Sequence, residues 1–254
     1  MRTTYGPDPS QFGDLSVPAG SGPWPVVVVI HGGFWRARYD LTLGQPLAAD
    51  LVRRGFAAWN IEYRRVGNGG GWPATLLDVA AAVDRLADLA GAAGPDGEAL
   101  DLRRVIALGH SAGGHLAAWL AARPRLPAPF GPAAVRVTGV VSQAGVLDLE
   151  AARADRLGDG AIDAFMAGAA KPDWASASPI RLLPVGVPVV CVHGDADDTV
   201  PVAQSERFVA AARAAGDPAR SMIIPGGDHF GVITPGDPGW AACAQAVEEL
   251  AGGS

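Results

Sequence analysis

Short apolar runs alternate with amphipathic segments along most of the chain. The run VVVVI at residues 26–30 is apolar at every position and contains only β-branched side chains, which predicts a strand buried on both faces. Comparable runs recur further along the chain. The pattern predicts strands at Val26–Ile30, Ala57–Glu62, Arg104–Gly109, Val135–Gln143, Val187–His193 and Ser221–Pro225.

Helical patterns fill the intervals between these strands. From Leu76 to Ala90, apolar side chains recur at helical spacing and would form one buried face. The regular alternation predicts a single α/β domain over residues 1–254, with a mostly parallel, doubly wound sheet covered by helices on both faces. The predicted helices are Leu43–Arg54, Thr75–Ala90, Gly113–Arg123, Ala203–Ala215 and Gly239–Ala251.

One interval is longer than a simple crossover between strands requires. It runs from about residue 148 to residue 183 and contains several short amphipathic stretches. Connections of this length in a compact domain are often lids or binding loops. We therefore expect short extra helices here that form a lid-like insertion.

Composition and charge narrow the class of protein. The 254 residues are 49% hydrophobic and 18% charged, as expected of a globular protein with a large core. The net charge of −6 and the lack of any basic run argue against nucleic acid or an anionic membrane as the main partner.

The location of the protein is predicted from what the sequence lacks. No apolar run approaches the roughly 20 residues that span a bilayer, and the first residues contain no signal-peptide core. Cys191 and Cys243 lie in apolar segments and are expected to be buried free thiols. These features favour a cytoplasmic location.

The segment GHSAG at residues 109–113 matches the pattern G-x-S-x-G between a predicted strand and a predicted helix. A sharp turn at this junction requires small residues on both sides of the serine, and it raises the hydroxyl above the carboxyl edge of the sheet. Ser111 is therefore the candidate nucleophile. The alternative is a glycine-rich helix start with Ser111 as its capping residue.

A serine hydroxyl needs a base to remove its proton. Of the five histidines, His229 is the best candidate, because it lies beyond the last predicted strand where no structural role demands an imidazole. His31 is expected to brace its own loop, His115 to pack in a helix, and His193 to fix the loop that follows its strand.

The base must be oriented by a carboxylate. The segment HGDADDTVP after the penultimate strand supplies Asp195, Asp197 and Asp198, in the chain order Ser–Asp–His that is expected on this fold. Asp195 is expected to be a turn residue. Asp148, which follows an earlier strand, is an outside alternative.

The segment HGGFW at residues 31–35 brings glycine backbone to the end of the first core strand. Backbone N–H groups in such a loop stabilise the oxyanion of an acyl-transfer reaction, together with the N–H of the residue after the nucleophile. Gly33, Phe34 and Ala112 are the predicted donors. Phe34 and Trp35 are expected to line the substrate pocket with His110, although a core role for Trp35 is equally compatible with the sequence.

With HGGFW, GHSAGG, HGDADDTVP and GGDHF in this order, the chain resembles the α/β-hydrolase superfamily. It looks like small bacterial esterases related to the hormone-sensitive-lipase and kynurenine-formamidase-like groups. In the family pattern H-G-x-x-D-x-x-V-P the acid falls on Asp197. Asp198 is then expected to cap the helix that begins near Pro201. The resemblance implies no cofactor, and no metal-ligand spacing is apparent.

The chain departs from the hormone-sensitive-lipase pattern in two respects. Phe34 stands where a third glycine is usual, and few residues precede the first core strand, so a large N-terminal cap is not expected. The resemblance implies that the 148–183 insertion supplies the lid instead. Its candidate wall residues are Phe165, Met166 and Trp174.

The resemblance implies a carboxylesterase that uses Ser111, His229 and Asp197 to cleave esters of small acyl groups. An aromatic followed by tryptophan after H-G-G is also similar to kynurenine formamidases, which makes an arylformamidase the main alternative. A non-catalytic binding protein of the same fold is a further alternative. The expected partner is a small-molecule ester or amide, and the sequence leaves the oligomeric state open.

Overall fold

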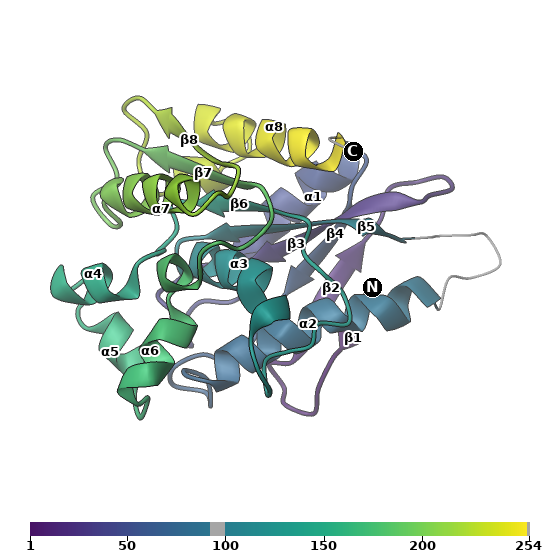
Figure 1. Ribbon diagram of the computed structural model, residues 1–254. Helices are drawn as coiled ribbons and strands as arrows, with labels where there is room; N and C mark the ends of the chain where they lie inside the picture. Colours follow the sequence, from purple (N-terminus) through teal and green to yellow (C-terminus); the bar gives the residue numbers. More distant parts are fainter. Residues whose placement is uncertain (92–99, 253–254) are drawn as a thin grey trace.

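An eight-stranded sheet in the order β1-β2-β4-β3-β5-β6-β7-β8 forms the centre of the structure (Figure 1). This computed structural model describes residues 1–91 and 100–252, so residues 92–99 and 253–254 of the predicted domain range lie outside the described residues. From β4 to β8 all neighbouring strands are parallel, whereas β1 and β2 add an antiparallel edge. The strands are β1 Arg2–Thr4, β2 Phe12–Ser16, β3 Trp24–Ile30, β4 Ala57–Ile61, β5 Leu100–His110, β6 Gly139–Gln143, β7 Val189–Gly194 and β8 Ala219–Ile224.

Helices cover both faces of the sheet, as predicted. The alternation of side chains along β3 explains how one strand serves two cores: Val26 and Val28 belong to one buried cluster, and Val27 belongs to the other. The first cluster lies under α2 (Ala74–Gly91), α3 (Ala112–Ala122) and α7 (Ala203–Ala214). The second lies under α1 (Gln45–Arg53) and α8 (Pro238–Gly252), which are next to each other above the sheet in Figure 1.

Two features of the sheet differ from the sequence prediction. The antiparallel strands β1 and β2 were not predicted, and β6 begins at Gly139 rather than Val135. Val135 and Val137 are only 5% exposed, so they are buried in the core without pairing in the sheet. These positions are hydrophobic because they are buried. A buried segment need not be a strand, so the apolar pattern extended the predicted strand too far.

The insertion after β6 folds into short helices, as predicted. They are α4 (Leu149–Ala154), α5 (Ala161–Phe165) and α6 (Lys171–Ala177), followed by a 3-10 helix at Pro179–Leu182. The end of α6 is fastened to α3, because His115 Nε2 donates to the Ala177 carbonyl at 2.8 Å. In Figure 1 these helices project beyond α3 on one side of the molecule. Within the described residues, no helix combines the length and apolar character that crossing a membrane would require.

Candidate active site

Ser111 lies at a sharp turn between β5 and α3. Its backbone has φ 54° and ψ −115°, an uncommon conformation for a non-glycine residue and the kind of strain that clusters at functional sites. A Cβ at Gly109 would collide with the Gly113 backbone, and a Cβ at Gly113 would collide with the Ile30 carbonyl. The predicted elbow geometry is therefore present. The capping alternative is wrong, because the Ser111 side chain makes no capping hydrogen bond to α3.

His229 and Asp197 meet at the carboxyl end of the sheet. The Nδ1 atom of His229 lies 2.6 Å from Asp197 Oδ2, a short distance for a charge-assisted hydrogen bond. The Asp197 side chain is fully buried and that of His229 is 4% exposed. Because a carboxylate can only accept, Nδ1 carries the proton and leaves Nε2 free to act as a base.

The Asp197 carboxylate is held by several donors. Its Oδ1 accepts the backbone N–H groups of Thr199 and Val200, both at 2.8 Å, and its Oδ2 also lies 3.1 Å from His193 Nε2. Burial by itself would raise the pKa of this group. The hydrogen bonds from His193, His229 and Val200 outweigh burial and hold the pKa of Asp197 well below its usual range, so it is a carboxylate at neutral pH.

The other candidate acids have structural positions. Asp195 Oδ1 accepts the Gly226 N–H at 2.6 Å, and Asp148 caps α4 by accepting the Ala151 N–H at 3.0 Å. The predicted capping role of Asp198 is wrong: its carboxylate accepts only the Thr199 hydroxyl, and α7 begins at Ala203 without a side-chain cap. Asp197 instead holds the turn, because its Oδ1 accepts the N–H groups of Thr199 and Val200.

The HGGFW loop has an unusual backbone. Gly33, Phe34 and Trp35 have φ values of 107°, 50° and 54°, so three successive residues adopt the left-handed region. A hydrogen bond from Val66 N to the Trp35 carbonyl, 2.7 Å long, holds the end of the loop. In the described part of the chain, no hydrogen bond occupies the N–H groups of Gly33, Phe34 or Ala112. These are the three predicted oxyanion donors.

A buried polar cluster braces this loop, and most of its members were not identified from the sequence. His31 Nε2 donates to Glu62 Oε1 at 3.0 Å, Arg65 pairs with the same carboxylate oxygen at 2.8 Å, and Tyr63 donates to the His31 carbonyl at 2.7 Å. The bracing role of His31 was predicted and is confirmed. Glu62 was missed because it ends a predicted strand, and only the pairing of β3 with β4 brings it to His31.

Trp35, which was assigned to the substrate pocket, is buried in the core, the alternative that the sequence left open. Trp35 has no exposed surface; its indole stacks on Phe165 with 4.5 Å between ring centroids and meets His115 edge-on. The positive φ of Trp35 turns its side chain into the core under α5, so its assignment to the pocket is wrong. Phe165 and Met166 are likewise buried rather than exposed on a lid wall.

His110 connects the elbow to the loop that carries His229. It is 5% exposed, comparable to Ser111 and His229, and it lines a small pocket beside His31 and Gly32, so its assignment to the substrate pocket stays a prediction. Its Nε2 donates to the His229 carbonyl at 2.9 Å, and the two rings lie 4.6 Å apart. Burial, with the charge of His229 as a lesser cause, lowers the pKa of His110 to about 3, so His110 is neutral at physiological pH.

Phe230 is a further residue at the site that sequence reasoning did not single out. It follows His229, is 57% exposed and presents its ring edge-on to that imidazole. A single exposed aromatic is not unusual in itself, and it is the contact with His229 that places Phe230 at the site. The sequence could have indicated this residue, because in the segment DHF an aromatic directly follows the candidate base.

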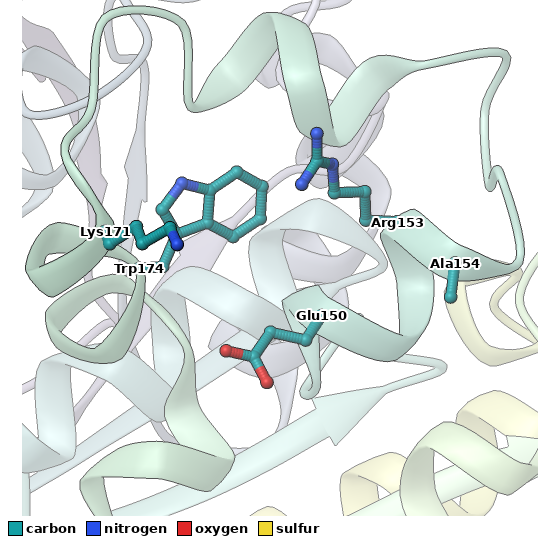
Figure 2. Close-up of a pocket in the computed structure, with 5 residues that line it drawn as sticks. All are labelled: Glu150, Arg153, Ala154, Lys171 and Trp174. Carbon is teal, nitrogen blue, oxygen red and sulfur yellow. The ribbon is translucent and has the colours of Figure 1, made fainter.

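The insertion contains a cavity of about 580 Å³ between α4 and α6. Figure 2 shows the indole of Trp174 and the charged ends of Arg153, Lys171 and Glu150 around it. Arg153 lies over the Trp174 ring at 5.1 Å and pairs with Asp163 at 2.5 Å, so it joins all three helices of the insertion. Trp174, one of the three predicted wall residues of the lid, lines this cavity.

The insertion also contacts the HGGFW loop. Phe34 packs so closely on Gly158 that a Cβ there would collide with its ring, and the Arg36 guanidinium donates to the Gly158 carbonyl. The segment between α4 and α5 therefore lies against the loop that carries the predicted oxyanion donors. Among the described residues, no group of three or more metal-ligating side chains is gathered in one place.

The parallel sheet, the serine elbow and the buried Asp–His pair together define an α/β hydrolase. The chain belongs to the BD-FAE family, whose model matches residues 14–211. Its curated relative esterase LipQ of Mycobacterium tuberculosis is 30% identical over 205 residues, which cover 76% of this chain and 46% of LipQ. The chain thus spans less than half of that relative's length.

Solved structures of the same fold cover nearly the whole chain. Esterase B of Lactobacillus rhamnosis, inhibited by a tributyrin phosphonate, has a TM-score of 0.82 at 21% identity and covers 99% of this chain and 85% of its own. Propionate-bound esterase Est2 of Thermogutta terrifontis has a TM-score of 0.78 at 21% identity, and the match covers 98% of this chain and 92% of the Est2 chain. Likeness at this identity establishes the fold, and the predicted fold class is confirmed.

Proposed function

We propose that this protein is a serine hydrolase that cleaves carboxylic esters of small acyl groups through an acyl-enzyme. The observation that carries the proposal is the 2.6 Å contact between His229 Nδ1 and Asp197 Oδ2, in a chain whose only G-x-S-x-G serine lies at a strained elbow. A buried carboxylate that fixes the Nδ1–H tautomer is what a histidine needs in order to accept a proton from serine at Nε2.

In the proposed mechanism, Ser111 Oγ attacks the ester carbonyl while His229 Nε2 takes the hydroxyl proton. The carbonyl oxygen becomes an oxyanion that the N–H groups of Gly33, Phe34 and Ala112 stabilise. The intermediate collapses, the C–O bond to the alcohol breaks, and His229 returns the proton to the departing alkoxide. Water then attacks the acyl-enzyme with the same assistance, and this step releases the acid and regenerates Ser111. No step needs a cofactor.

The comparisons support an ester as the substrate. The relative LipQ is named an esterase, and the structural neighbours include esterases with bound propionate and with a phosphonate inhibitor. Propionate is a small acyl product, which agrees with the preference proposed here. The formyl-amide alternative has no comparable support among these relatives.

The proposal is tested by active-site labelling and by a small substrate panel. A fluorophosphonate probe should label the wild-type protein at Ser111 and should not label Ser111→Ala. Hydrolysis of p-nitrophenyl butyrate should fall by at least about a thousand-fold in Ser111→Ala, with circular dichroism unchanged. Labelling at another residue or unchanged turnover would refute the mechanism. If N-formylkynurenine is turned over faster than every ester, the protein is a formamidase and the proposed esterase activity is wrong.

A further inference from the structure

The buried imidazole of His193 lies between the Asp197 turn and α7. Its Nε2 atom is 2.8 Å from the Val200 carbonyl and 3.1 Å from Asp197 Oδ2, while its Nδ1 atom is 2.8 Å from Ser205 Oγ. The side chain is completely inaccessible to solvent. His193 therefore touches the same carboxylate oxygen as His229, from the opposite side of the proposed catalytic pair.

The partners of His193 determine where its proton lies. Both oxygens near Nε2 belong to groups that only accept, a carbonyl and a carboxylate, so Nε2 must carry the hydrogen. With a single ring proton on Nε2, Nδ1 is an acceptor, and the Ser205 hydroxyl is placed to donate to it. The resulting chain runs from Ser205 through His193 to Asp197 and on to His229, and each bond in it has one donor and one acceptor.

We propose that His193 is a positioning residue for the reaction, which acts by donating a hydrogen bond to Asp197 and so limits the negative charge that this carboxylate presents to His229. The inference rests on the esterase function proposed above. It assigns to the histidine of the HGDAD segment a role beyond holding the loop that follows β7.

The effect follows from competition for one oxygen atom. Asp197 Oδ2 accepts from both histidines, whereas Oδ1 is already occupied by the backbone N–H groups of Thr199 and Val200. If the donor from His193 is lost, more negative charge remains on Oδ2. The protonated form of His229, which cannot accept the serine proton, is then stabilised and persists to higher pH.

Few other titratable groups face this chain of hydrogen bonds. His110 on β5 contacts the ring of His229 but is kept neutral by burial, which lowers its pKa to about 3. Cys191 on β7 is, like His193, a hydrogen-bond partner of the Ser205 hydroxyl. Burial raises the pKa of Cys191 to about 12, so it is an uncharged thiol. Neither changes charge in the range where the acid limb of an esterase profile is measured.

Two substitutions of His193 distinguish the loss of its hydrogen bond to Asp197 from the loss of its ring packing. His193→Gln keeps an amide N–H near the position of Nε2, whereas His193→Asn keeps a polar group near Nδ1 and cannot reach Asp197. In His193→Asn we expect the acid limb of the kcat/KM profile for p-nitrophenyl butyrate to move up by about half a pH unit, and kcat to fall about ten-fold. His193→Gln should remain close to wild type in both.

Ser205→Ala is the matched control for a purely structural role. It removes the partner of His193 Nδ1 but leaves the donor from Nε2 to Asp197 in place, so it should lower Tm without moving the acid limb. The proposal is overturned if His193→Asn lowers Tm while its acid limb coincides with that of wild type. It is also overturned if Ser205→Ala moves the limb as far as His193→Asn does.

A measurement on the unmodified protein covers the case in which His193→Asn does not fold. Nitrogen-15 chemical shifts of the His193 ring should report Nε2–H and an unprotonated Nδ1 throughout pH 6–8. An Nδ1–H tautomer, or a doubly protonated ring at pH 7, would refute the inference. Because this readout needs no turnover, failure of the esterase assay alone counts against the proposed function and leaves the hydrogen-bond assignment to be judged separately.

Discussion

Phe230 stands edge-on to His229, with 5.3 Å between the ring centroids and an interplanar angle of 84°. The same phenyl ring is 57% exposed, so one edge touches the proposed catalytic imidazole and the rest faces solvent. An aromatic surface in this position would be covered when an ester binds, and binding would then remove apolar area from water.

We therefore predict that Phe230→Ala weakens substrate binding and leaves the chemistry largely intact. KM for p-nitrophenyl butyrate should rise about three- to ten-fold, which corresponds to roughly 1 kcal/mol of lost apolar contact, with kcat within about two-fold of wild type. Ile223→Ala removes a 36% exposed side chain from β8 and is the matched control, which should leave KM unchanged. An unaltered KM in Phe230→Ala would exclude this ring from the substrate site.

The two adjacent aspartates should differ sharply in their effect on rate. Asp197→Asn should lower kcat by up to about ten-thousand-fold, because an amide in that position favours the wrong tautomer of His229. Asp198→Asn should change kcat less than two-fold and stability by about 0.5 kcal/mol or less, since Asp198 is exposed and holds no backbone group. Steady-state kinetics and thermal melts of both variants test this, and an exchange of the two phenotypes would contradict the assignment of the acid.

Short acyl chains should be preferred over long ones. Phe165 stacks on Trp35, and Phe34 packs on Gly158, so bulky side chains already fill the space behind the HGGFW loop. A pocket that ends there cannot gain the ~0.8 kcal/mol that each further buried methylene would contribute beyond about six carbons. We expect kcat/KM for p-nitrophenyl esters to peak between acetyl and hexanoyl. A rise that continues to the laurate ester would rule out this account of the pocket.

Acid should destabilise the protein below about pH 6.5, before its carboxylates titrate. Burial lowers the pKa of His115 to about 4 from its ordinary value of 6.5, and its Nδ1 has no hydrogen-bond partner among the described residues. The folded state then binds fewer protons than the unfolded chain, so stability that is present above pH 6.5 is lost as pH falls toward 4. This single group costs about 2 kcal/mol by pH 5.

His115→Gln provides the test, because glutamine can still donate to the Ala177 carbonyl but does not titrate. Urea denaturation at pH 7 and pH 5 should reveal a smaller loss of stability in the variant than in wild type. His110, which is also buried and neutral, keeps its own contribution in both proteins and serves as an internal reference. Equal losses in the two proteins would mean that His115 is not the group that responds.

The sequence predicted the parts of the fold that local pattern determines. β3 was recognised because residues 26–30 are apolar on both sides, and the elbow because two glycines flank Ser111. β1 and β2 were missed, since Arg2–Thr4 and Phe12–Ser16 show no strong alternation and form strands because β2 pairs with the edge of β4 and β1 pairs with β2. Their stability comes from tertiary pairing rather than from propensity.

The site was predicted where chain order and spacing were sufficient, and missed where side-chain direction mattered. The family pattern that HGDADDTVP resembles selected Asp197 as the partner of His229. It could not reveal that Trp35 turns inward, because that depends on a positive φ at a residue where none is expected. Nor could it reveal the pairing of Glu62 with His31, which are 31 positions apart and meet only through strand register.

The cavity between α4 and α6 has a practical consequence. Lys171, one of its lining residues, is the only lysine in the sequence. In a protein whose N-terminal amine is blocked, an amine-reactive fluorophore would attach at this single position. Trp174 lines the same cavity, so the emission of the attached dye would respond to its contact with this indole and would report how the insertion helices move when an ester is added.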